Sequence, residues 1–126
     1  MAVKRSLDAK ETGMASIRIT ARLIAKGERA FGPGKADLLE RIAAEGSISR
    51  AAKSMEMSYS RAWQLVDAMN HSFRQPLVES SAGGRKGGGA VLTRMGEEVL
   101  AQFRCMEGKL KAEADGFFAE FEKRLK

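Results

Sequence analysis

The sequence is poor in the residues that build disulfides, metal sites and catalytic pairs. Its 126 residues include one cysteine, Cys105, and one histidine, His71. A single cysteine excludes an intramolecular disulfide framework, which fits a reducing compartment such as the cytoplasm. One histidine and one cysteine also leave too few ligands for a metal site and no partner for a nucleophile and base pair. We therefore expect no enzyme, no cofactor and no metal.

Long hydrophobic runs are also missing. No stretch of about eighteen uncharged apolar residues is present, so we expect no transmembrane helix and no membrane partner. The first 13 residues lack the apolar region of a secretory signal. At about 100–200 residues per domain, the length suits one globular domain in the cytoplasm.

Positive charge is in excess, and it is confined to one part of the chain. Lys and Arg number 22 against 16 Asp and Glu, a net charge of +6. Residues 94–126 contain seven charges of each sign, so residues 1–93 hold the whole excess, fifteen positive against nine negative. This division predicts a basic surface for a polyanion and an electrically balanced segment after it.

Apolar periodicity and capping residues predict three helices before residue 73. They span Lys35–Glu45, preceded by a possible start at Pro33, Ile48–Met55 and Tyr59–Ser72. Gly46 is a favoured helix stop, and Ser47 and Ser58 are favoured N-caps for the second and third helices.

The sequence allows two sets of residues on the inward face of the third helix. Trp63, Val66 and Met69 form one inward set, and Ala62, Leu65 and Met69 form another. We interpret Trp63 as a core side chain and not as a base-stacking residue, since it follows the exposed Arg61 at a position that faces back to the core.

Strands are predicted on both sides of these helices. Apolar residues alternate with polar ones over Ser16–Ile24, the pattern of a half-buried strand. Leu77–Ser81 and Ala90–Leu92 flank a glycine-rich segment, residues 82–90, and together they predict a hairpin.

The last helix is predicted from Arg94 to Leu125, with Thr93 as its N-cap. It would be about 48 Å long, more than a small domain can cover by itself. One continuous apolar stripe follows its length, so we expect a homodimer through this helix. The expected interface residues are Val99, Phe103, Met106, Leu110, Phe117 and Phe121.

The order of these elements predicts the fold. Three helices followed by a basic glycine-rich hairpin are typical of a winged helix-turn-helix, a mainly α fold with a small β-hairpin wing. We expect a flexible N-terminal tail over residues 1–15, the winged helix-turn-helix over 16–93 and the dimerisation helix over 94–126.

This fold predicts double-stranded DNA as the partner. The recognition helix, about residues 58–72, would enter the major groove, and the wing would contact the backbone or minor groove. Candidate DNA-binding residues are Ser58, Tyr59, Ser60, Arg61 and Gln64 on the recognition helix, Ser49, Arg50 and Lys53 on the helix before it, and Arg85 and Lys86 in the wing. The alternative is a winged-helix module that pairs with another protein through its long helix and does not read DNA sequence.

Two motifs carry a resemblance to a known family. Ser47–Lys53 (S-I-S-R-A-A-K) and Met57–Trp63 (M-S-Y-S-R-A-W) resemble motifs of the ModE family, the molybdate-responsive transcriptional regulators, and of their LysR-type relatives. Glu79–Gly96 resembles that family's wing and the start of the following helix. The resemblance covers about residues 16–113.

The resemblance implies a dimeric winged-helix repressor or activator that is linked to molybdate transport or molybdenum metabolism. It places Ser58–Arg61 in the recognition helix, Arg85 and Lys86 in the wing, and the last helix at the dimer interface. Two departures matter. Glu56 lies in the turn where many such motifs carry glycine. Full-length members also continue into a molybdate-binding module whose residues have no counterpart here, so we expect that molybdate does not bind this chain directly.

Overall fold

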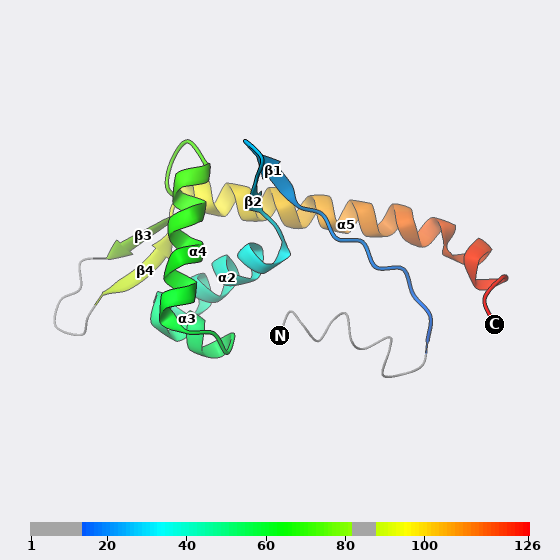
Figure 1. The fold of residues 1–126 in the computed structure, drawn as a ribbon, viewed down its shortest axis with the longest axis horizontal. Helices are drawn as coiled ribbons and strands as arrows, with labels where there is room; N and C mark the ends of the chain where they lie inside the picture. Colours follow the sequence, from blue (N-terminus) through cyan, green and yellow to red (C-terminus); the bar gives the residue numbers. More distant parts are fainter. Residues whose placement is uncertain (1–13, 82–87) are drawn as a thin grey trace.

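The computed structural model describes residues 14–81 and 88–126, and within these ranges it contains four α-helices and two antiparallel β-hairpins (Figure 1). The elements are, in order, β1 (Leu23–Ala25), β2 (Glu28–Phe31), α2 (Pro33–Glu45), α3 (Ile48–Ser54), α4 (Tyr59–Ser72), β3 (Val78–Ser81), β4 (Gly89–Leu92) and α5 (Arg94–Glu122). The fold is the predicted winged helix-turn-helix followed by a long helix. Of the expected tail, residues 1–13 lie outside the described ranges. None of the described helices is long and apolar enough to cross a bilayer.

The helix boundaries follow from the predicted caps. α2 begins at Pro33 and ends at Gly46, whose positive φ of 82° is the left-handed C-cap conformation that favours glycine. The Ser47 and Ser58 hydroxyls accept hydrogen bonds from the backbone N–H groups of Arg50 and Arg61, both at 3.0 Å. These caps satisfy N–H groups that would otherwise lack partners at the starts of α3 and α4.

The core lies where the three short helices, the wing and the first turns of α5 meet. Its largest fully buried side chains are Phe31, Leu38, Leu39, Ile42, Met69 and Leu77. Ala51 and Ala52 of α3 are also buried, and such small side chains allow α2 and α4 to approach α3 closely. α4 turns Ala62, Val66 and Met69 inward.

The prediction of Trp63 as a core residue is wrong. Its side chain is 48% exposed, whereas the adjacent Ala62 is fully buried. One helical position is a rotation of about 100°, so only one of the two residues can face the core.

The strand predicted over Ser16–Ile24 is also wrong for most of its length. Residues 14–22 form no regular element, and β1 begins only at Leu23. β1 pairs with β2, and both Lys26 and Gly27 in the turn between them have positive φ, as in a type I′ hairpin. Because β2 has four residues before Gly32 and α2, it offers hydrogen-bond partners to a short strand only.

The predicted hairpin is confirmed as β3 and β4, and two contacts anchor it to the helices. Asn70 of α4 accepts hydrogen bonds from the N–H groups of Leu77 and Val78 through its Oδ1 atom, and its Nδ2 atom donates to the Val78 carbonyl. The N–H of Ala90 donates to the carbonyl of Gly46 at 2.8 Å. The base of the wing is therefore bonded to both ends of the helix-turn-helix.

α5 begins inside the domain and then leaves it (Figure 1). Thr93 caps its first turn by accepting from the Gly96 N–H at 2.9 Å. Gly96 is buried against the backbone of Leu77. Phe103 packs edge-on against Phe31, with 5.1 Å between ring centroids, and is 5% exposed. Phe103 therefore belongs to the core of this domain, which corrects its assignment to a dimer interface.

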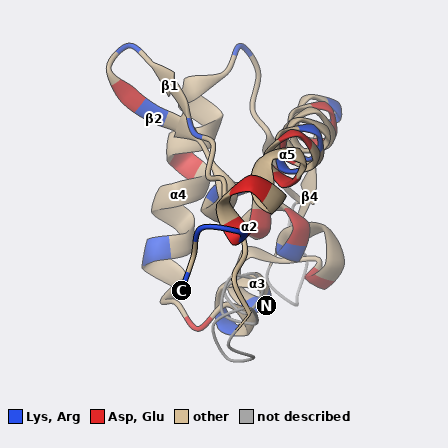
Figure 2. Cartoon of the chain, turned by 90° about the vertical axis from the view of Figure 1, so that its right-hand side faces the viewer, with Lys and Arg blue, Asp and Glu red and all other residues tan. Residues whose placement is uncertain are grey.

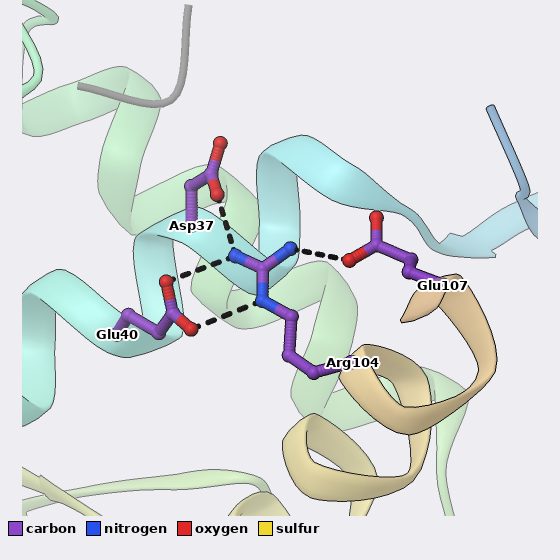
Figure 3. A network of polar contacts seen from close by, with 4 residues as sticks. All are labelled: Asp37, Glu40, Arg104 and Glu107. Carbon is purple, nitrogen blue, oxygen red and sulfur yellow. Dashed lines mark hydrogen bonds and ion pairs between the residues drawn. The ribbon is translucent and has the colours of Figure 1, made fainter. Parts of the chain in front are cut away.

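Arg104 of α5 bonds to three carboxylates, two of which lie on α2 and one, that of Glu107, on α5 itself (Figure 3). Its guanidinium donates to Asp37 at 2.6 Å, to both carboxylate oxygens of Glu40 at 2.9 and 3.0 Å, and to Glu107 at 2.8 Å. The hydrogen bonds to Glu40 raise the pKa of Arg104 most, with Glu107 and Asp37 adding to them, although burial opposes the shift. The charge is thus retained at any pH at which the protein folds.

Gly96 and Gly108 provide a matched pair of substitutions. A Cβ atom on Gly96 would collide with the carbonyl of Leu77, whereas one on Gly108 meets nothing within 4 Å. We expect Gly96→Ala to lower the free energy of unfolding by about 3 kcal/mol. Gly108→Ala should raise it by about 0.5–1 kcal/mol through helix propensity. Urea denaturation followed by circular dichroism measures both, and a neutral Gly96→Ala variant would contradict the close packing of α5 on the wing.

Arg104 and Lys111 provide a second matched pair of substitutions, because both residues lie on α5 and both form ion pairs with carboxylates. Arg104→Met would leave Asp37, whose side chain is 11% exposed, without its partner, and we expect a loss of about 2 kcal/mol. Lys111→Met breaks an exposed pair with Asp115 and should cost less than about 0.5 kcal/mol. Equal effects of the two substitutions on urea denaturation would show that Arg104 does not hold the helices together.

Candidate nucleic-acid interface

The candidate interface is built from α3, α4 and the wing. The turn between α3 and α4 closes through hydrogen bonds from the N–H groups of Glu56 and Met57 to the carbonyls of Lys53 and Ala52. Glu56 has a positive φ of 58°, the conformation that glycine adopts most readily. The turn expected from the sequence therefore forms, and the glutamate carries a backbone strain of about 1 kcal/mol.

The residues predicted on α3 lie on its outer surface. Ser49, Arg50 and Lys53 are all exposed. The Nε atom of Arg50 also donates to the carbonyl of Glu45 at 3.0 Å, at the end of α2. Arg50 therefore caps α2 as well as contributing charge, whereas Ser49 and Lys53 form no side-chain hydrogen bond with any of the residues that the structure describes.

The residues predicted on α4 are also exposed, but they divide between two flanks of the helix. Tyr59, Ser60 and Gln64 line a shallow, open hollow of about 380 Å³. Trp63 lies among them. Arg61 instead lies close enough to Lys35, at the start of α2, to influence its pKa.

Lys35 is the centre of a basic region that the sequence interpretation missed. Its Nζ atom donates to the carbonyl of Arg29 at 2.9 Å. Burial lowers the pKa of Lys35, and the positive charges of Arg61 and Arg29 lower it further, while Glu28 acts in the opposite direction. An anion placed here would relieve repulsion among three cations. No run of basic residues marks this region, because its members come from β2, α2 and α4.

A second hollow, of about 480 Å³, lies between the helix-turn-helix and the wing. Its lining joins predicted DNA-binding residues of α3 and α4 to the base of the wing, and consists of Ser47, Ile48, Ser49, Arg50, Tyr59, Ser80, Gly88 and Gly89. The structure thus brings Ser49, Arg50 and Tyr59 together and adds Ser80, whose position was not predicted. A Cβ atom at Gly89 would lie 2.9 Å from the carbonyl oxygen of Gly46, so glycine permits this close approach.

Three further predictions concern the wing residues, metal sites and the charge of the last helix. Arg85 and Lys86 of the wing fall outside the described residues. Within residues 14–81 and 88–126, no group of three or more His, Cys, Asp or Glu side chains could hold a metal ion. Along α5, Lys and Arg are interspersed with Asp and Glu (Figure 2).

Comparison with known families identifies the same segment. The model of a bacterial regulatory helix-turn-helix family, the lysR family, matches residues 35–97, which is half of the chain. The match runs from the start of α2 to the first turn of α5.

Similar proteins carry names connected with molybdenum or with transcription. The chain is 46% identical over 78 residues to the molybdenum transport protein ModE of Azotobacter vinelandii, covering 62% of this chain and 29% of that protein. It is 43% identical over 84 residues to the molybdenum-pterin-binding protein MopA of Rhodobacter capsulatus, covering 67% and 32%. It is 46% identical over 68 residues to the DNA-binding transcriptional dual regulator ModE of Escherichia coli (strain K12), covering 54% and 26%. The chain thus spans less than a third of the length of these curated relatives.

Proposed function

The chain belongs to the lysR family of bacterial regulatory helix-turn-helix proteins, and from this premise we propose that it is a dimeric, sequence-specific regulator of transcription in the cytoplasm. Residues 58–72 would form its recognition helix in the major groove of double-stranded DNA. The wing, residues 82–90, would contact the backbone or the minor groove.

The observation that carries this proposal is the hollow shared by α3, α4 and the wing. Ser49, Tyr59 and Ser80 come from three different elements and line the same concave surface. Hydroxyl groups are suitable donors to phosphate oxygens, which contribute most of the hydrogen bonds in protein–DNA interfaces. Lys53, exposed on α3, would add a phosphate contact on the same part of the domain.

The exposed side chains of α4 are suited to base edges. A helix with its side chains is about 10–12 Å wide and fits a major groove about 12 Å wide. In this arrangement Gln64 would bond to adenine and Arg61 to guanine or to a phosphate, while Ser58 and Ser60 would serve either kind of contact. The fifteen positive charges of residues 1–93 would supply the affinity that does not depend on sequence.

The outer part of α5 is proposed as the dimer interface. Beyond Arg104 its apolar stripe is solvent-exposed, from 38% at Met106 and 39% at Leu110 to 63% at Phe117 and 57% at Phe121. Val99 packs partly against the core and would mark the inner end of the stripe. A second copy fits this face because residues 94–126 carry seven charges of each sign, so two such segments need not repel each other.

A role in molybdenum-dependent regulation is proposed from the names of the relatives. We assign no molybdate site to this chain, since the similarity covers less than a third of their length.

Selection of bound duplexes from random DNA tests the function. We expect the protein to enrich an inverted repeat with half-sites about 34–36 Å apart, because a twofold dimer presents two recognition helices. A Gln64→Ala variant should lose discrimination at one base position in each half-site. Weak binding that does not depend on salt or sequence would instead favour the protein-docking module.

Sedimentation at micromolar concentration tests the dimer. Leu110→Glu combined with Phe117→Glu should give a monomer, because charge would be buried in an apolar interface. Lys109→Glu, which also adds negative charge to exposed α5 surface, should leave the dimer intact and serves as the control. A monomeric wild-type protein would refute the proposed interface.

A further inference from the structure

Trp63 is exposed on α4, and its side chain is not needed to fill the core. The inward side of α4 is filled by Ala62, Val66 and Met69, none of which is more than 5% exposed. Tryptophan is usually highly buried, and a half-exposed one on a helix surface points to a contact outside the domain.

The residues next to Trp63 indicate the chemistry of that contact. Tyr59 precedes it by four residues, so the two aromatic side chains lie on the same flank of α4. Tyr59 is 55% exposed, and both rings line the open hollow together with Ser60 and Gln64. The hollow therefore combines apolar ring surface with hydroxyl and amide groups that can bond to base edges.

This combination of aromatic and amide side chains is suited to an A·T base pair. Gln64 can form two hydrogen bonds with adenine in the major groove. In an A·T pair, the C5-methyl group of thymine lies in the same groove, and it is recognised by apolar contact. An aromatic surface one residue away from the glutamine complements this methyl group, whereas a G·C pair presents only polar groups there.

We propose that Trp63, supported by Tyr59, contacts the C5-methyl group of a thymine beside the base read by Gln64 and so gives the protein a preference for A·T pairs at this step. The inference rests on the proposed DNA-binding function. It adds a specificity-determining residue to the predicted set.

Replacing single thymines of the selected half-site by deoxyuridine tests the contact, because this removes the methyl group and leaves the base-pairing unchanged. At one thymine, we expect the wild-type protein to bind about four-fold more weakly, the effect of exposing one methyl group. Trp63→Ala should bind the thymine duplex more weakly and should be insensitive to deoxyuridine at that position. Trp63→Phe should restore part of the sensitivity.

The controls separate this inference from the proposed function. His71→Ala changes an exposed ring two turns further along α4 and should keep the full response to deoxyuridine. Equal thermal unfolding of the variants would show that they are folded. If wild type binds the selected duplex but every deoxyuridine affects wild type and Trp63→Ala equally, the thymine contact is wrong while the DNA-binding function stands. If wild type selects no sequence, both are overturned.

Discussion

The bond network of Arg104 sets the direction in which α5 leaves the domain, and the proposed quaternary arrangement depends on that direction. The guanidinium holds Asp37 and Glu40 of α2 from a position on α5 beside the buried Phe103. Removing one member would leave a charge in a poorly solvated place, so the network resists rearrangement. Apolar side chains of α5 before this point pack in or against the core, and those after it project into solvent. The Arg104 network would therefore also fix the spacing of the two recognition helices in a dimer.

A second constraint couples the wing to the helix-turn-helix. Gly96 contacts Leu77 through backbone atoms, Asn70 bonds to the start of β3, and Ala90 bonds to Gly46 in the turn between α2 and α3. The contacts of Gly96 with Leu77 and of Ala90 with Gly46 join segments that are distant along the chain. As a result, Ser49, Tyr59 and Ser80 are held around one hollow by bonds that do not involve their own side chains. A preorganised surface of this kind loses little conformational entropy when it binds DNA.

Local chemistry explains why most helices were predictable. Ser47, Ser58 and Thr93 act as N-caps, and Gly46 ends α2, because these interactions involve residues within four positions of each other. The strand over Ser16–Ile24 was not predictable in the same way. Its alternation was real, but a strand exists only where a partner strand is available, and β2 supplies four residues. Likewise, the basic region around Lys35 gathers residues from three elements and leaves no mark in the sequence.

The sequence by itself determined the order of the elements from α2 onward, the winged helix-turn-helix class, the exposed residues at the start of α4 and the balanced charge of residues 94–126. All of these depend on periodicity, capping and composition. Only the tertiary structure decided which apolar side chains serve the core and which face outward. Phe103 and Phe117 belong to one stripe in the sequence, yet the first is buried and the second is 63% exposed. The sequence allowed either Trp63 or Ala62 to face inward and was interpreted in favour of Trp63, yet the smaller residue faces the core. The reason is that periodicity defines a face of a helix, whereas packing against other elements determines how much of that face is covered.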